Sequence, residues 1–575
     1  MLFLIWVLLW IFAALPVLTI TKKLIEKFKK ERFRRDWYEE DWSGIASFFR
    51  FILTLIIFGI LAWSCVPDAI MWWIWIGWFL FWTMIEAFAI DIHHLITILS
   101  IFSLIGILVA SFVVMGLASY HNALYFDSFI QKAEGFPIEN EVPDNLLRLT
   151  TKELAQTIAA QYMAELGGAL KIVDMQVTLY QGRLVWVAVI ARQEAWGTTY
   201  KTEGLVIVDA NNPDKKPEIL KESFAVAQGL DFNPIIGAWG SATAKGYYGI
   251  DTSISIGDTY PVLTPEGKWQ MAMTSYVVDW LGVRHYNGIY LLDQQGNIIA
   301  HYKDEIPNWL IQPFDEESFL EGGIAAWGGH KRGDGFDLFA GGFLWIPPSP
   351  DRLAISEDTR YVYDPDTGQV VALIMIHSVR EKGELSLAGA FKVTSKGIFY
   401  YDLKGYNLMS GNAASGIIQS KITARTGTRY FTAMELIYPL KVKNETKFVW
   451  FIPVYFENLE THQIGLAGLG LVDAQAADKV IIEYTGEGIT GPTLIKKAKE
   501  SFRALYGEKV VPETRQVTGK VLEIYPPYIK NGNTHQWILL ETSKGERLEV
   551  LLNTEILSDE EWLKIQKLKI GDTLT

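Results

Sequence analysis

The pattern that most constrains this chain is the alternation of long apolar runs with one short basic segment in the first 120 residues. The basic segment, Lys22–Arg35, carries eight Lys or Arg residues. The runs on either side of it, Leu2–Ile20 and Phe48–Val66, are each long enough to cross a bilayer as a helix. Since Lys and Arg collect on the cytoplasmic side of membranes, the basic segment is predicted to be cytoplasmic.

Two further apolar runs, Ala69–Ile90 and Leu95–Ser119, predict a third and a fourth membrane helix. The first run has no basic residues before it and no small-residue cleavage pattern after it, which favours a retained helix over a signal peptide. Four crossings place the N-terminus and everything after Tyr120 on the outer face. The sequence therefore predicts a multi-pass cell-membrane protein, in contact with the lipid bilayer, whose large C-terminal region is extracytoplasmic.

Charge and cysteine content exclude some functions for the remainder of the chain. The formal net charge is −13 over 575 residues, which argues against attraction of the whole protein to nucleic acid. The only cysteine is Cys65, so no intramolecular disulfide can form and disulfides do not report the compartment.

After a polar connector at 121–150, Thr150 or Thr151 begins a predicted helix that Gly167–Gly168 ends. Three strand-like segments follow: KIVDMQVTLY, LVWVAVIA and GLVIVD. A helix followed by an antiparallel meander resembles a PepSY-type domain. The resemblance covers about 70 residues and implies a regulatory domain of the kind found in secreted or membrane-tethered proteins.

A short motif then repeats along the exterior region. A glycine, four apolar residues and an aspartate occur as Gly204–Asp209, Gly288–Asp293 and Gly468–Asp473, and Glu-Ser-Phe follows each copy. Each aspartate is interpreted as ending a strand in a turn, where its side chain bonds its own backbone. The alternative, that the three aspartates converge on a metal ion, is not favoured, because repeats separate equivalent positions.

The predicted fold is an α-helical membrane region of four transmembrane helices, followed by a mostly antiparallel α+β exterior with internal repeats and a small C-terminal barrel. The predicted order is a transmembrane region (1–120), connector (121–150), PepSY-like repeat (151–240), second β-rich repeat (241–330), inserted β-rich region with glycine-rich loops (331–435), third β-rich repeat (436–512) and OB-like barrel (513–575).

A glycine-rich stretch, 321–345, holds the densest polar cluster of the exterior: His330, Lys331, Arg332, Asp334 and Asp337. Exposed glycine backbone offers N–H donors, so a loop binding an anionic group or a partner is one interpretation. A solvated loop with a charged tip is the other. The phosphate-loop spacing GxxxxGK[ST] is absent.

Other candidate motifs are incomplete. Asp364–Gly368 begins like a calcium loop but lacks the expected glutamate, and Ser410 and Ser415 have no GxSxG sequence around them. The sequence therefore predicts no catalytic residue, no metal site and no cofactor.

The C-terminal stretch 513–575 resembles a small OB-like barrel in its strand order and final Gly-Asp. Such barrels bind oligonucleotides or sugars across one face. Tyr525, Tyr528 and Trp537 form a candidate stacking surface. Residues 516–575 carry seven basic and nine acidic side chains, which provide no groove for phosphate. Protein contact ranks first here, glycan second, and nucleic acid is disfavoured.

Together these features predict a membrane-anchored extracytoplasmic interaction or assembly protein, a scaffolding component of a cell-envelope or membrane-associated complex. Protein partners or self-association suit its aromatic composition. The alternative is an extracytoplasmic, membrane-tethered enzyme or enzyme regulator with its site near the 321–345 stretch. The lack of a catalytic motif favours the first interpretation.

Overall fold

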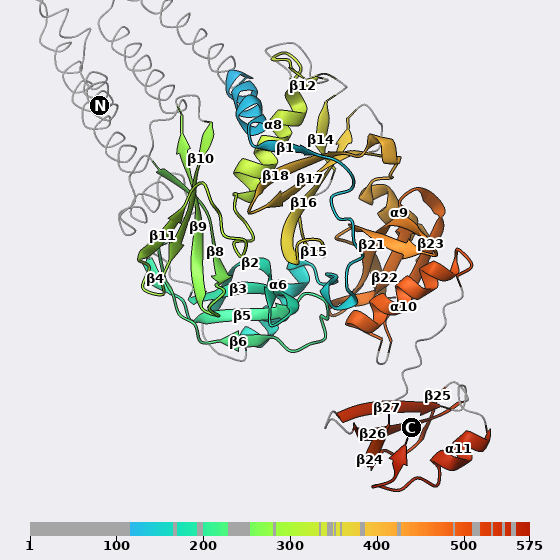
Figure 1. Cartoon of the computed structure of the whole chain (residues 1–575). Helices are drawn as coiled ribbons and strands as arrows, with labels where there is room; N and C mark the ends of the chain where they lie inside the picture. The colour runs from blue at the N-terminus through green and yellow to red at the C-terminus, as the bar shows by residue number, and fades with distance from the viewer. Residues whose placement is uncertain are drawn as a thin grey trace, which may run out of the picture. The chain divides into compact units, whose positions relative to one another are not determined.

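In the computed structural model the chain forms two compact units, Met1–Glu508 and Lys509–Thr575 (Figure 1). The residues that the structure describes are 116–164, 170–192, 199–227, 254–279, 283–332, 335–341, 349, 352–356, 359–379, 386–422, 427–486, 489–508, 518–530, 533–542, 547–553 and 559–574.

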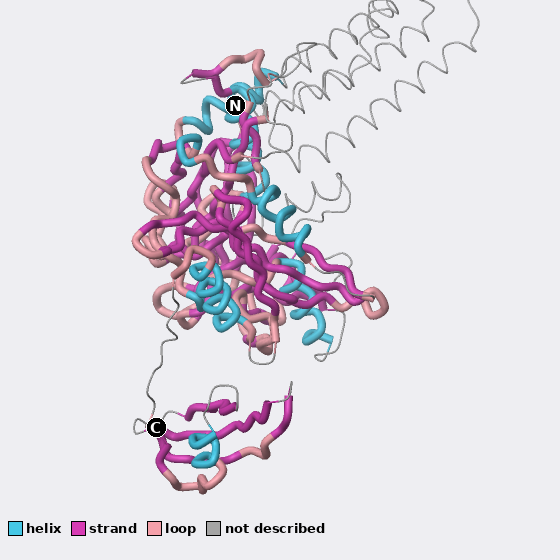
Figure 2. Tube along the Cα trace, turned by 90° about the vertical axis from the view of Figure 1, so that its right-hand side faces the viewer, coloured by secondary structure: helices cyan, strands magenta, loops and turns pink. Residues whose placement is uncertain are grey.

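No helix in these ranges is both long and apolar enough to span a membrane. The predicted four-helix transmembrane fold and the multi-pass cell-membrane localisation are therefore corrected. The fold is mostly antiparallel β sheet with short helices (Figure 2). The helix of residues 491–504, for example, buries Leu494, Ile495 and Ala498 on one face and exposes the other, so an apolar stretch of bilayer length is not required. The four predicted spans lie outside the described residues, apart from the last residues of the fourth, which begin the helix of residues 116–127.

The described part of the larger unit contains four antiparallel meanders. The first follows α6 (Lys152–Ala164) and is ordered β2-β3-β5-β6; the second is ordered β8-β9-β10-β11. Their strands are β2 (Leu170–Tyr180), β3 (Arg183–Arg192), β5 (Gly204–Asp209), β6 (Glu218–Leu220), β8 (Ile254–Leu263), β9 (Trp269–Val278), β10 (Arg284–Leu292) and β11 (Ile298–Tyr302). The two-stranded pair of β4 (Thr199–Lys201) and β7 (Ala225–Ala227) is separate.

The third and fourth meanders are each followed by a helix, α9 (Gly411–Lys421) and α10 (Gly491–Ala504). In Figure 1, α10 crosses the sheet beside β22 and β23. The strands are β14 (Leu353–Ile355), β15 (Arg360–Asp364), β16 (Gln369–Ser378), β17 (Leu387–Thr394), β18 (Gly397–Asp402), β19 (Thr428–Thr432), β20 (Leu436–Val442), β21 (Glu445–Asn458), β22 (Ile464–Asp473) and β23 (Ala476–Tyr484). The region 331–435, expected to be an insertion, thus holds a meander of its own.

One glycine recurs on the third strand of every meander. A Cβ there would fall between 2.3 and 2.8 Å from a carbonyl oxygen of the fourth strand, so only glycine permits the approach. The glycines are Gly204, Gly288, Gly389 and Gly468. Where three of these strands end, the aspartate accepts hydrogen bonds from backbone N–H groups two to four residues on. In the third meander Thr394 takes that role, accepting from Lys396 N at 3.1 Å.

Alternating side chains explain why the first sheet is apolar on both faces. Trp186 and Ala188 of β3 pack with α6, whereas Val185 and Val187 pack against Trp269 and the rest of the second sheet. Successive strand residues point to opposite faces, so a strand covered on both sides reads as a continuous apolar run.

Within the glycine-rich stretch 321–345, residues 322–330 form a helix and not the expected loop. A π-helical turn, η2 (Glu316–Glu321), runs into α8 (Gly322–His330), and the short pair β12 (Lys331–Arg332) and β13 (Gly335–Phe336) follows. The glycines serve close packing: a Cβ on Gly323 would lie 2.3 Å from Phe126, and one on Gly328 2.5 Å from the Leu353 carbonyl oxygen.

The stretch 121–150, expected to be a polar connector, contributes several residues to the core. The helix of residues 116–127 buries Phe126, and β1 (Ile130–Ala133) pairs in parallel with β18. Residues 134–150, called the strap below, bury Ile138, Leu147 and Leu149 completely and include the short 3-10 helix η1 (Asp144–Leu146).

The C-terminal unit is an antiparallel sheet with one short helix, α11 (Asp559–Ile565). Its strands are β24 (Gly519–Ile524), β25 (Tyr528–Lys530), β26 (Asn533–Thr542), β27 (Arg547–Asn553) and β28 (Thr573–Leu574). Within the described residues of this unit, β27 pairs with β26 and β28 pairs with β24. In the same residues, β27 and β28 are not paired with each other.

Candidate functional site

A cavity of about 830 Å³ lies where the strap, the four meanders and η2 meet. Its volume is in the range of pockets that hold small organic molecules. The wall is strongly polar, with six carboxylates and three cationic side chains: Glu153, Asp258, Glu316, Glu317, Glu321, Glu435, Arg148, Lys152 and Arg360. Aromatic rings from Trp186, Tyr361, Phe431 and Tyr455 also line it.

Arg148 is the most unusual residue of this wall, because it is charged and only 4% exposed. Its guanidinium lies 5.3 Å from the centre of the Trp186 ring. Within the described residues, its Nε atom has no hydrogen-bond partner. Burial, together with the positive charge of Arg360, lowers the pKa of Arg148 to about 10. A buried cation without a paired anion is unfavourable and marks a position where an anion would be stabilised.

Hydrogen bonds on both sides of Arg148 fix its position. The N–H groups of Leu149 and Thr150 both donate to the carbonyl oxygen of Ala210, at 2.8 and 2.9 Å. Trp186 Nε1 donates to the Thr150 carbonyl oxygen at 2.8 Å, which holds the ring beneath the guanidinium. Leu149 and Thr150 are thereby tied to Ala210, in the turn between β5 and β6 of the first meander.

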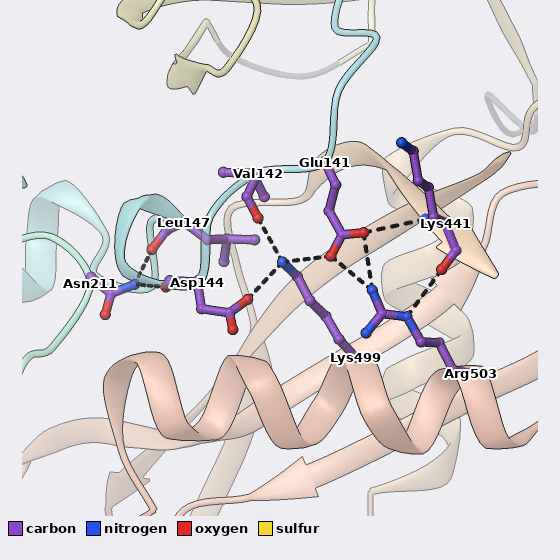
Figure 3. Close-up of polar contacts among 8 residues, drawn as sticks. All are labelled: Glu141, Val142, Asp144, Leu147, Asn211, Lys441, Lys499 and Arg503. Carbon is purple, nitrogen blue, oxygen red and sulfur yellow. Dashed lines mark hydrogen bonds and ion pairs between the residues drawn. The ribbon is translucent and has the colours of Figure 1, made fainter. Parts of the chain in front are cut away.

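On its other side, the strap is held by α10 (Figure 3). The buried Lys499 ammonium donates to the Val142 carbonyl oxygen at 2.6 Å and pairs with Asp144 at 2.7 Å and Glu141 at 3.2 Å. Arg503 adds two contacts of 3.0 Å to the Glu141 carboxylate.

Asn211 completes this arrangement from the first meander. Its amide donates to the carbonyl oxygens of Asp144 and Leu147, at 2.8 and 2.6 Å. The strap is thus fixed between the first and fourth meanders immediately before Arg148, which makes the site rigid on this side.

Glu316 faces the cavity from the start of η2. Its backbone N–H donates to Asp258 Oδ2 at 3.1 Å, and Gln312 Nε2 donates to the same oxygen at 2.9 Å. Burial raises the pKa of Glu316 to about 7, and the charges of Glu321 and Asp258 act in the same direction. A carboxyl group with this pKa can both donate and accept a proton near neutral pH.

The far wall is built by contacts that join η2 to the third meander and the third meander to the fourth. Glu321 accepts from the Thr359 hydroxyl at 2.9 Å, and Arg360 Nη2 lies 3.4 Å from a carboxylate oxygen of Glu435. Burial raises the pKa of the Tyr361 hydroxyl well above its usual value, so this phenol stays protonated. These contacts leave a cavity with one under-compensated cation and an excess of acceptors.

The polar cluster expected at 330–337 lies away from the cavity. His330 is buried, with Ser119 Oγ at 3.1 Å from Nε2 and the Asp337 carbonyl oxygen at 3.0 Å from Nδ1. Lys331 lies over the Phe336 ring at 4.7 Å, and Arg332 donates to the Ala340 carbonyl oxygen at 3.2 Å. These residues contact the Ser119 hydroxyl, the Phe336 ring and nearby backbone, and they do not line the cavity. Asp334 lies outside the described residues.

The candidate stacking residues lie on neighbouring segments of the C-terminal unit. Tyr525 N donates to the carbonyl oxygen of Trp537 at 3.0 Å, and Tyr528 pairs with His535 in the β25–β26 ladder. The Tyr525 and Trp537 side chains are half-buried. The three residues are close along the sheet, and glycan stacking on them stays a prediction.

Sequence reasoning missed the cavity residues because they are far apart along the chain. One local signal was present: Arg148 stands inside LLRLT, where a charge interrupts an apolar segment. A charged residue at a buried position needs a partner, and that partner was not identifiable from neighbouring residues.

Comparisons with known proteins add little. No family model matches the chain, and no curated protein sequence matches it. A solved structure of a BT0996–RGII complex has 9% identity and a TM-score of 0.19, over 76% of this protein and 96% of that one. Another, described as "Glycoside hydrolase", has 9% identity and a TM-score of 0.20 with the same coverage. Similarity at this level supports no functional argument.

Proposed function

We propose that this chain is a binding protein whose central cavity takes a small organic acid that also carries hydroxyl or amino groups. The observation that supports this most directly is the buried guanidinium of Arg148 on the cavity wall, with its Nε lacking a partner in the described structure. A carboxylate or a similar anionic group of the ligand would supply the missing charge and hydrogen bonds.

The other charged side chains of the wall indicate which further groups the ligand carries. Carboxylates outnumber cations, so a ligand with only anionic groups would be repelled by Asp258, Glu316 and their neighbours. Hydroxyl or amino groups donate hydrogen bonds to carboxylates, and they would satisfy these acceptors. We therefore favour acidic sugars and amino acids over simple dicarboxylates.

Paired ligands that differ only in the acidic group test the proposal. Glucuronate is compared with glucose, and glutamate with glutamine, by thermal shift and calorimetry on the full chain. We expect a saturable rise in the melting temperature with an acid but not with its neutral analogue, and loss of that rise in Arg148→Met. The variant Arg183→Met is the matched control, because Arg183 pairs with Glu218 outside the cavity lining.

The Arg148→Met variant also distinguishes a ligand-binding role of the arginine from a purely structural one. If Arg148 serves binding, replacing it with Met removes an under-compensated buried charge and leaves the ligand-free protein as stable or more stable. A marked loss of stability in ligand-free Arg148→Met, or unchanged binding by that variant, would show that the arginine is structural and would overturn the proposal.

A second candidate, catalysis, is supported by Glu316 alone. A cavity carboxyl with a pKa near 7 beside further carboxylates is a common arrangement for general acid–base chemistry. The Glu316→Gln variant distinguishes an enzyme from a binding protein. If the chain is an enzyme, the substitution abolishes turnover of the bound acid. If it is a binding protein, the wild type and the variant both release the ligand unchanged.

The interaction or assembly role expected from the sequence is compatible with this proposal and rests on the C-terminal unit. Residues 509–575 form a compact unit of their own, as modules that contact partners commonly do. Size-exclusion chromatography with light scattering on the full chain and on a chain ending at Glu508 tests it. Self-association that depends on the last 67 residues would support the role, and identical monomers would oppose it.

A further inference from the structure

Outside the cavity, three metal-ligating side chains converge from distant parts of the chain. His121, Asp279 and His285 each offer a ligand atom, and these atoms lie within 4.8 Å of one another. His121 belongs to the helix of residues 116–127, Asp279 follows β9, and His285 lies in β10. Nothing in the proposed function depends on this group.

The separations between the ligand atoms suit a single ion. Nε2 of His285 lies 3.0 Å and Nε2 of His121 3.5 Å from the same Asp279 oxygen, Oδ2. In a tetrahedral zinc site with bonds of about 2.0 to 2.1 Å, neighbouring ligand atoms are about 3.3 Å apart. The side chains therefore need only small shifts to bind a metal between them.

Hydrogen bonds and ring contacts orient the ligands. Asp279 Oδ1 accepts the N–H of Val283 at 2.9 Å, which directs Oδ2 towards the two imidazoles. The His285 ring lies on Tyr125, with centroids 4.2 Å apart. The Tyr125 hydroxyl in turn accepts the backbone N–H of Tyr286 at 2.9 Å. Supporting contacts of this kind fix ligand orientation in metal sites.

The site is also reachable from solvent. The side chain of His121 is 46% exposed, that of His285 33% and that of Asp279 19%. Three protein ligands with one open face leave a coordination position for water. Two imidazoles and one carboxylate favour a first-row transition metal over Mg²⁺ or Ca²⁺, which prefer oxygen ligands.

The geometry points to a divalent transition-metal site formed by His121, Asp279 and His285, with Zn²⁺ the ion it fits. Bound metal would join the helix of residues 116–127 to the β9–β10 hairpin of the second meander. The positive ion would replace the imidazole protons that otherwise face the Asp279 carboxylate.

Cobalt titration of the metal-stripped full chain tests this. We expect one Co²⁺ per chain with the visible absorption of tetrahedral coordination, displaced by Zn²⁺ and unaffected by Mg²⁺. His121→Asn and His285→Gln should each weaken Co²⁺ binding by at least about tenfold, as loss of one of three ligands requires. His462→Asn is the control, because His462 pairs with the Glu457 carboxylate at 3.2 Å without belonging to the three-ligand group.

Folding of each variant is checked by circular dichroism, and His121, the most exposed ligand, is the safer substitution. Zn²⁺ should also raise the melting temperature of the wild type and the control but not of the ligand variants. Absence of Co²⁺ absorption, or equal binding by the wild type and both ligand variants, would show that the three residues form only an ion-paired cluster.

Discussion

The ammonium of Lys499 lies 2.6 Å from the carbonyl oxygen of Val142, although 357 residues separate the two along the chain. A second buried lysine, Lys392, makes the equivalent contact to the carbonyl oxygen of Pro137 at 2.7 Å and pairs with Asp364 at 2.8 Å. The third meander, through Lys392 of β17, and α10, through Lys499, thus each bind the strap with a buried lysine. Since the strap leads directly into Arg148, these contacts determine the geometry of the cavity.

We expect Lys499→Met to destabilise the larger unit by about 3 kcal/mol, because the Val142 carbonyl oxygen and the carboxylates of Glu141 and Asp144 lose their buried cation. Urea unfolding at pH 7 measures this.

Lys497→Met is the matched control on the same helix. Its ammonium pairs with Glu483 at 3.0 Å but is 48% exposed, so a change below about 1 kcal/mol is expected. Equal effects of the two substitutions would show that the Lys499 contacts contribute no more than a surface ion pair.

Local patterns explain how much of this fold the sequence could predict. The Gly-to-Asp motif located the third strands of three meanders, because glycine and aspartate have specific backbone roles there. The remaining meander was missed, since Thr394 replaces the aspartate and Gly389 lies within a different sequence. Glycines of α8 suggested a loop, yet they serve close packing against Phe126 and Leu353.

Contacts between distant residues explain what could not be predicted. The strap looked polar because it carries charged residues such as Glu141 and Asp144. Their partner Lys499 comes from the other end of the chain, so the pairing is not visible locally. The cavity brings Arg148 together with Glu316 and Glu435, which are far apart in sequence. Composition and periodicity carry no information on such pairings.

Glu316 makes stability depend on pH. The folded chain retains the Glu316 proton up to a pH of about 7, whereas an ordinary glutamate releases it near 4.5. Between these values the folded state binds more protons than the unfolded state, so this residue lowers stability as the pH rises through that window. Relative to Glu316→Gln, we expect the wild type to lose about 1 to 3 kcal/mol between pH 4.5 and pH 8.

Urea unfolding of both proteins across that pH range measures the difference. Glu457→Gln, a change outside the cavity lining, shows how the rest of the chain responds. A constant gap between wild type and Glu316→Gln at every pH would contradict the raised pKa.

Gly468→Ala tests the close approach that recurs in all four meanders. The added Cβ would lie 2.3 Å from the Glu483 carbonyl oxygen, and backbone on both strands would have to move. We expect a loss of about 2 kcal/mol, as for overpacking in a rigid interior. Gly416→Ala in α9 is the control, because a Cβ there meets nothing within 4 Å and should stabilise the helix by about 0.5 to 1 kcal/mol. A neutral Gly468→Ala would show that the strands can separate freely.

Two truncations test where the larger unit ends. A chain ending at Glu508 lacks only the C-terminal unit, so its main thermal transition should match that of the full chain. A chain ending at Thr490 also lacks α10, with Lys499 and the fully buried Phe502, and the loss of Phe502 packing alone corresponds to about 3 to 5 kcal/mol. We expect this second chain to lose its cooperative transition and to become sensitive to protease within the strap. Differential scanning calorimetry and limited proteolysis measure both effects. A cooperative transition that survives without α10 would show that the strap is held by the first and third meanders alone.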